Sequence, residues 1–154
     1  MTEEDTSSFT DACDRAEKVA LRLIARAEQS SLRLTAKLEK KGFDAPAAKH
    51  VVSSLVDRNL LNDARYAELW IRSRLSMNKK VTPLWLLSSL EKRGINRKAS
   101  REALEKVLDP ETEYSLLIDF MKKASARKSE NPWAMKHYLK KEGFSHEILE
   151  KLYS

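Results

Sequence analysis

The chain has 154 residues, of which 34% are charged and 42% hydrophobic, with three glycines, one cysteine and a net charge of +6. This composition is typical of a helix-rich, soluble protein with few loops. The single cysteine, Cys13, excludes an internal disulfide and suits a reducing cytosol, so we expect a cytoplasmic protein. No segment approaches the roughly 18 consecutive apolar residues of a membrane-spanning helix, so we expect no membrane association.

The first eleven residues are polar and acidic, without the basic and apolar regions of a signal peptide. We expect residues 1–11 to form a disordered acidic tail. After Asp11, apolar side chains recur at spacings of three and four, which predicts an amphipathic helix. Similar leading helices are predicted after Asp63 and after Asp109, and no segment alternates like a strand.

All three glycines lie in the same local pattern, which predicts where helices end. A leucine stands four residues before each glycine, and another apolar residue follows it directly. Helices commonly end at a glycine with positive φ, and the residue after that glycine then packs on the residue four before it. The predicted pairs are Leu38 with Phe43, Leu90 with Ile95, and Leu139 with Phe144.

Favoured helix N-caps flank each glycine at constant distances, twelve residues before it and two residues after it. They are Ser30, Thr82 and Asn131 before the glycines, and Asp44, Asn96 and Ser145 after them. The glycines are 52 and 49 residues apart, a period that accommodates three helices. The sequence therefore predicts an all-α protein of three tandem three-helix repeats, residues 12–61, 62–109 and 110–154, stacked into an elongated, curved array.

The positive charge is concentrated in the middle repeat. Residues 62–109 carry 11 basic and 6 acidic side chains, whereas the flanking regions are close to neutral. Such an excess attracts polyanions, because each neutralised phosphate releases condensed counterions. The candidate contacts with nucleic acid are Arg65, Arg72, Arg74, Lys79, Lys80, Lys92, Arg93, Arg97, Lys98 and Arg101.

The tryptophans and histidines do not form a pattern typical of a catalytic, metal-binding or base-stacking site. Tryptophans stack on unpaired bases in some proteins, but the helical positions of the three here favour packing in the core or between repeats. These residues are Trp70, Trp85 and Trp133. The three histidines have spacings unlike a metal site, and neither a phosphate loop nor a dinucleotide motif is present. We therefore predict a protein that is not an enzyme and that needs no cofactor or metal.

The ordered motifs of the chain resemble the RecX family, the regulatory proteins of the RecA recombinase. The central signature is Leu60-Leu61-Asn62-Asp63-Ala64-Arg65-Tyr66-Ala67, followed by Arg72-Ser73-Arg74 and by Lys92-Arg93-Gly94-Ile95. The opening stretch agrees as well, with Leu23-Ile24-Ala25-Arg26, Lys37-Leu38 and Lys41-Gly42-Phe43. Two positions depart from the family pattern, since Asn59 replaces a usual glycine and the run Met77-Asn78-Lys79-Lys80-Val81 contains none. Asparagine tolerates the left-handed conformation, so the turn at Asn59 is expected to survive.

The resemblance implies tandem three-helix repeats, no catalytic residues, and binding to the RecA filament on single-stranded DNA. It further implies damping of ATP hydrolysis, strand exchange and co-protease activity, with an influence on recombination and the damage response. The expected protein is a monomer with weak, non-specific affinity for single- or double-stranded DNA. Two alternatives stay open: a helix-turn-helix regulator that reads duplex DNA through Arg97, Lys98 and Arg101, or a helical scaffold that binds only protein.

Overall fold

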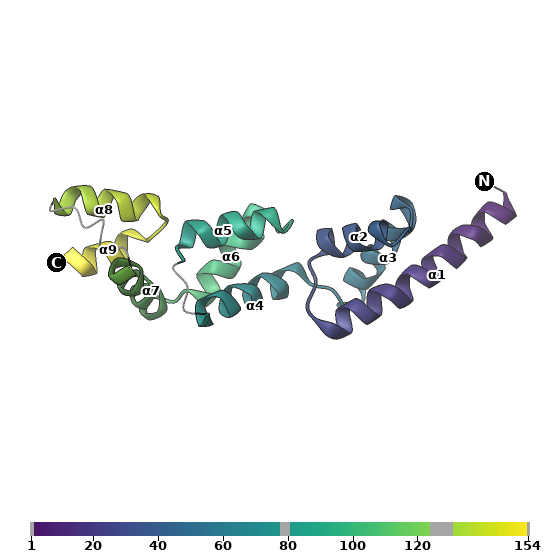
Figure 1. Ribbon diagram of the computed structural model, residues 1–154, viewed down its shortest axis with the longest axis horizontal. Helices are drawn as coiled ribbons and strands as arrows, with labels where there is room; N and C mark the ends of the chain where they lie inside the picture. The colour runs from purple at the N-terminus through teal and green to yellow at the C-terminus, as the bar shows by residue number, and fades with distance from the viewer. Residues whose placement is uncertain (1, 78–80, 124–130, 154) are drawn as a thin grey trace. The chain divides into compact units, whose positions relative to one another are not determined.

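The computed structural model describes residues 2–77, 81–123 and 131–153. Within these ranges the chain is all-helical, with nine helices and no strand, which confirms the predicted fold class (Figure 1). The helices are α1 (Glu3–Arg26), α2 (Ser31–Lys40), α3 (Ala45–Asp57), α4 (Asp63–Ser76), α5 (Pro83–Lys92), α6 (Arg97–Val107), α7 (Pro110–Lys123), α8 (Pro132–Lys141) and α9 (His146–Tyr153). None of these helices is both long and apolar enough to cross a membrane.

The contacts divide the chain into two compact units. The first unit extends to Tyr66 and also includes Arg93–Ile95, and the second comprises Ala67–Lys92 and the residues from Asn96 onward. The organisation into three repeats and the curved array remain predictions.

The core of the first unit forms where α1, α2 and α3 pack together (Figure 1). Helix α1 contributes small buried residues, Ala16 and Ala20, which let the neighbouring helices approach closely. Helix α2 contributes Leu34 and Leu38, four residues apart and therefore on one face. Helix α3 adds Leu55, which is fully buried.

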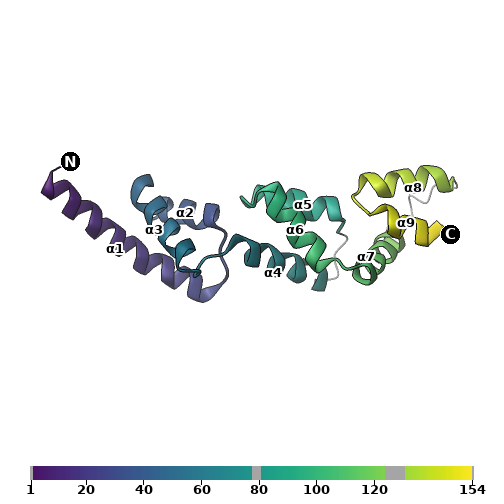
Figure 2. The same ribbon diagram turned by 180° about the vertical axis from the view of Figure 1, so that it is seen from behind.

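The second unit contains a core to which α7, α8 and α9 contribute. Figure 2 shows these three helices from behind. Leu117 and Leu139 are fully buried there, and the rings of Phe120 and Phe144 lie 5.9 Å apart. Helices α5 and α6 also pack on each other in this unit.

The N-terminal segment differs from its expected disorder, because α1 already begins at Glu3. Thr2 and Asp5 form a capping box, in which each side chain accepts from the other residue's backbone N–H. The first turn also contains three acidic residues, Glu3, Glu4 and Asp5, whose negative charges stabilise the helix through the positive end of its dipole. The expectation of a disordered tail over residues 1–11 is thereby corrected for residues 3–11.

The glycine turns have the predicted conformation. Gly42, Gly94 and Gly143 adopt φ of 102°, 89° and 97°. The Phe43 and Phe144 backbone N–H groups donate to the Leu38 and Leu139 carbonyls at 3.2 and 3.3 Å, the bonds that close a Schellman ending. Asn59 takes φ of 56°, so the turn in which it replaces a glycine also survives, as predicted.

The predicted N-caps are confirmed by hydrogen bonds to backbone N–H groups of the first turns. Their distances lie between 2.8 and 3.5 Å, and each satisfies a donor that the helix itself leaves unpaired. The capping residues are Ser30, Asp44, Thr82, Asn96, Asn131 and Ser145.

Candidate nucleic-acid and filament interface

The ten candidate cations are distributed over both units. Arg65 and Arg93 belong to the first unit, and six others belong to the second. These six are Arg72, Arg74, Lys92, Arg97, Lys98 and Arg101. Lys79 and Lys80, with most of the run 77–81, lie outside the described residues. The candidates therefore have to be judged one by one, by what each side chain already contacts.

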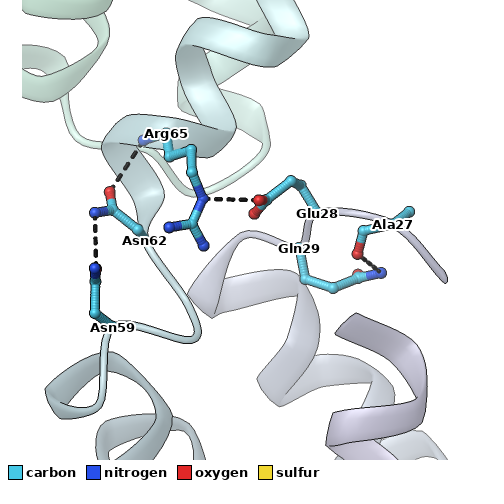
Figure 3. Close-up of polar contacts among 6 residues, drawn as sticks. All are labelled: Ala27, Glu28, Gln29, Asn59, Asn62 and Arg65. Atoms are coloured by element: carbon cyan, nitrogen blue, oxygen red, sulfur yellow. Dashed lines mark hydrogen bonds and ion pairs between the residues drawn. The ribbon is translucent and has the colours of Figure 1, made fainter. Parts of the chain in front are cut away.

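Arg65 is held by an acidic partner from the end of α1. Its Nε donates to Glu28 Oε1 at 2.7 Å, and both side chains are about one-third exposed, 38% and 32% (Figure 3). The backbone N–H of Arg65 donates to Asn62 Oδ1 at 3.0 Å, and Asn62 Nδ2 donates in turn to Asn59 Oδ1. The charge of Arg65 is thus largely neutralised within the first unit, which weakens it as a contact for phosphate.

Arg93 has a structural environment as well. Its Nη1 donates to the Tyr66 hydroxyl at 2.9 Å, and its carbonyl accepts from Ser30 Oγ at 2.9 Å. Through these two bonds, the short segment Arg93–Ile95 is tied to the starts of α2 and α4 in the first unit.

Arg74 lies on an aromatic pair. Its guanidinium carbon is 5.2 Å from the centre of the Trp70 ring, and Trp70 stacks on Trp85 with ring centres 5.8 Å apart. A guanidinium over an indole face is attracted by the ring quadrupole. Trp85 keeps 44% of its surface exposed, so this aromatic pair is packed within the second unit but open on one side. Trp70 therefore has the packing role that its helical position predicts. Trp85 is only partly covered.

The remaining cations are more accessible. Arg97 forms an ion pair with Glu91 at 3.2 Å, although its side chain is 73% exposed. Four others are exposed and make no ion pair within the part of the chain that the structure describes: Arg72, Lys92, Lys98 and Arg101. Lys98 and Arg101 are three residues apart on α6 and therefore neighbours on its surface. These four are the cations best placed to meet an external phosphate, and we call them the open cations.

Two partners of the candidate cations could not be read from the sequence. Glu28 lies 37 residues before Arg65, and Tyr66 lies 27 residues before Arg93. Neither residue belongs to a motif that signals an ion pair or a hydroxyl acceptor. The local sequence around a cation shows its charge but not whether tertiary contacts neutralise it.

Trp133 contradicts the expectation that it packs in the core or between repeats. It is 73% exposed in the first turn of α8, and its ring lies parallel to His137 with centres 5.6 Å apart. The first-turn position of α8 is thus a surface position in this protein. Groups of three or more metal-ligating side chains are absent from the described residues.

The comparisons with known proteins agree on one kind of relative. No protein-family model matches the chain. A curated protein named Regulatory protein RecX from Treponema pallidum is 29% identical over 143 residues, which cover 93% of this chain and 86% of the relative. A protein of the same name from Chromohalobacter salexigens is 35% identical over 86 residues, which cover 56% of this chain and 55% of that protein.

Solved structures show the same fold. The crystal structure of RecX from Lactobacillus salivarius has a TM-score of 0.71 at 22% identity and covers 94% of this chain and 96% of its own. A second crystal structure, of a regulatory protein RecX, has a TM-score of 0.74 at 16% identity and covers 97% of this chain and 76% of its own. The fold is therefore the all-helical fold of these regulatory proteins. Nearly the whole chain is thus similar to curated proteins named Regulatory protein RecX, and its fold is that of two RecX crystal structures.

Proposed function

We propose that this protein binds the filament that RecA forms on single-stranded DNA and modulates, mainly by inhibition, its recombinase, ATPase and co-protease activities. The observation that carries the proposal is the similarity of nearly the whole chain to proteins named as RecX regulators, 93% of it in the Treponema pallidum relative. Those relatives are named as regulatory proteins rather than enzymes. The protein then acts in the cytoplasm, on DNA repair and the damage response.

The open cations supply the physical basis for engaging a nucleoprotein polymer. Each exposed Lys or Arg that neutralises a phosphate adds affinity that does not depend on base sequence and that falls as salt rises. Arg72, Lys92, Lys98 and Arg101 are exposed and without ion pairs among the described residues, so no internal contact has to be broken first. We expect weak, salt-sensitive DNA binding alone and stronger binding to the filament.

Titration of the protein into the DNA-dependent ATPase reaction of RecA tests this proposal. The expected result is a progressive loss of ATP hydrolysis as the protein approaches stoichiometry with RecA on single-stranded DNA. Full hydrolysis at a stoichiometric concentration would contradict the proposal. A matched reaction with another DNA-dependent ATPase shows whether the loss requires RecA or follows from coating of the DNA.

The two alternatives have their own outcomes. A helix-turn-helix regulator prefers one duplex sequence by about three or more orders of magnitude, which a binding selection from random duplexes would reveal. A scaffold that binds only protein would leave both DNA and the RecA reaction unaffected. The filament regulator instead shows flat sequence selectivity together with inhibition.

A further inference from the structure

The start of α2 makes a contact that also occurs at the start of α5. In the first unit, the Leu32 side chain lies so close to Gly94 that a Cβ on this glycine has no room. Ser30 Oγ also donates to the carbonyl of Arg93, the residue before that glycine. The beginning of one helix thus packs on the glycine turn that ends another.

The second unit contains the equivalent contact. A Cβ added to Gly143 would lie 2.8 Å from the Leu84 backbone nitrogen, and the Leu84 N–H donates to the Glu142 carbonyl at 2.9 Å. Leu32 and Leu84 each stand ten residues before the glycine that ends their own helix. Arg93 and Glu142 each stand directly before the glycine that is contacted. The same positions therefore meet in both units.

The contact has two parts, the first-turn residue of one helix and the glycine turn that ends another. Each part also occurs once without the other. Trp133 stands ten residues before Gly143, in the position of Leu32 and Leu84, and is 73% exposed, more than Leu32 at 58% and Leu84 at 45%. Among the described residues, no other group lies within 4 Å of a Cβ added to Gly42, although φ is positive in its turn as well. The sequence of this open turn, Glu39-Lys40-Lys41-Gly42-Phe43, is close to that of the packed one, Glu91-Lys92-Arg93-Gly94-Ile95.

We propose that Trp133 at the start of α8 in one copy docks on the Gly42 turn of a second copy, joining copies head to tail. Such an interface is heterologous: it uses different surfaces on the two copies and leaves one of each available for the next copy. A Trp in a first turn offers more apolar area than the leucines in the internal contacts. This inference does not depend on the proposed function.

The contact is small, so it is weak in dilute solution. Stable interfaces bury about 1,200 Å² or more in total, which one helix start on one turn does not reach. At low concentration this contact alone therefore does not hold two copies together. When several copies are held close together, the effective concentration rises to about the millimolar range and favours the contact.

Cross-linking between two single-cysteine variants tests the proposal. Cys13 is buried, and this burial, with the nearby carboxylates of Asp14 and Asp44, raises the pKa of its thiol; Cys13→Ala removes it in both variants. Pro132→Cys places a thiol beside Trp133, and Lys41→Cys places one beside Gly42, both at exposed positions. The mixture treated with a short bis-maleimide should give more cross-linked dimer than either variant alone. As a control for random collision, Lys18→Cys on the exposed side of α1 replaces Lys41→Cys in the mixture.

Trp133→Ala, added to the Pro132→Cys variant, should lower the heterodimer yield at least about tenfold, because truncating an interface tryptophan commonly costs that much affinity. Leu69→Ala is the matched control, since Leu69 is also an exposed apolar residue, 46% exposed, but lies on α4. Circular dichroism verifies that both variants fold. A yield equal to that of the Lys18→Cys control, or one that Trp133→Ala leaves unchanged, would overturn the proposal. Loss of DNA affinity in Trp133→Ala without loss of cross-linking would assign this tryptophan to nucleic acid instead and would equally overturn it.

Discussion

The turns at Gly42 and Gly94 end α2 and α5 with nearly the same backbone conformation, yet their surroundings differ. Their φ angles are 102° and 89°, and both follow the same leucine–glycine spacing. In the part of the chain that the structure describes, no group lies within 4 Å of a Cβ added to Gly42, whereas Leu32 fills the space beside Gly94. The comparison shows two separate reasons for a glycine at the end of a helix. One is the positive φ that every helix ending of this type needs. The other is the close approach of a neighbouring residue, which occurs only where the turn is packed.

The largest effect is expected from Gly94→Ala. Alanine is strained at positive φ by about 1–2 kcal/mol, and its Cβ would overlap the Leu32 side chain, which adds about 1–3 kcal/mol of overpacking. Gly42→Ala carries only the backbone strain. Urea unfolding followed by circular dichroism should therefore show a clearly larger loss of stability for Gly94→Ala. Equal losses in the two variants would show that the Leu32 contact adds nothing.

A smaller effect is expected at Asn59, the non-glycine residue at positive φ among the described residues. Asn59→Ala should lower the free energy of unfolding by about 1 kcal/mol, because alanine lacks the tolerance of asparagine for the left-handed region. Asn59→Gly should be close to neutral, since glycine adopts this φ freely and only an exposed bond to Asn62 is removed. The two variants unfolded side by side check this prediction. A destabilising Asn59→Gly would mean that the bond to Asn62 matters more than the turn conformation.

The ion pair between Arg65 and Glu28 should contribute still less. Both side chains are partly exposed, and pairs of this kind contribute about 0–1 kcal/mol, less at high salt. We expect Arg65→Ala to lower stability within this range at low salt and by less at high salt, with little change in DNA affinity. A double-mutant cycle with Glu28→Ala isolates the pair. A large loss of DNA affinity in Arg65→Ala, with the fold intact, would show that Arg65 contacts DNA despite its ion pair.

The smallest effect concerns Asp109, the residue before α7. The Thr112 backbone N–H donates to its carboxylate at 2.7 Å, and this bond lowers the pKa of Asp109 below its usual 3.8. A lowered pKa in the folded state gives stability that is present above the ordinary value and is lost as pH falls through the lowered one. Asp109→Asn removes this pH dependence while keeping a favoured cap. Unfolding measured from about pH 6 to about pH 2 should show the variant and the wild type converging at the acid end. If the free energies of unfolding of the two proteins instead changed in parallel with pH, Asp109 would not be the source of this pH dependence.

Local features of the fold could be predicted from the sequence because each depends on neighbours a few residues apart. The cap at Ser30 and the turn at Gly42 involve partners within five residues. The helix start at Thr2 is equally local, but the acidic composition of the segment obscured the capping signal of Thr2 and Asp5. Apolar spacing likewise indicated that the helix after Asp11 is amphipathic, and Ala16 and Ala20 of α1 are buried. These signals fix the helices but say little about their tertiary partners.

The site was less accessible to prediction because charge alone does not reveal pairing. Arg65 and Arg93 read as surface cations, yet Glu28 and Tyr66 hold them from distant positions in the chain. Trp133 read as a packing residue because of its position in the predicted helix, and only the structure shows that it is 73% exposed. Whether a cation is neutralised and whether a tryptophan is buried both depend on contacts between segments that are remote in the sequence.

The most direct test of the central claim removes the open cations together and measures binding to the RecA filament as salt is varied. Replacing Arg72, Lys92, Lys98 and Arg101 by alanine should weaken binding and reduce the slope of log affinity against log salt by about 0.7 for each phosphate that the variant no longer neutralises. The matched control removes the same charge from α1, at four exposed cations that form no ion pair with any described residue: Arg15, Lys18, Arg22 and Arg26. The account predicts a clear loss in the first variant and near wild-type binding in the second. Equal binding by the two variants, at every salt concentration, would contradict it.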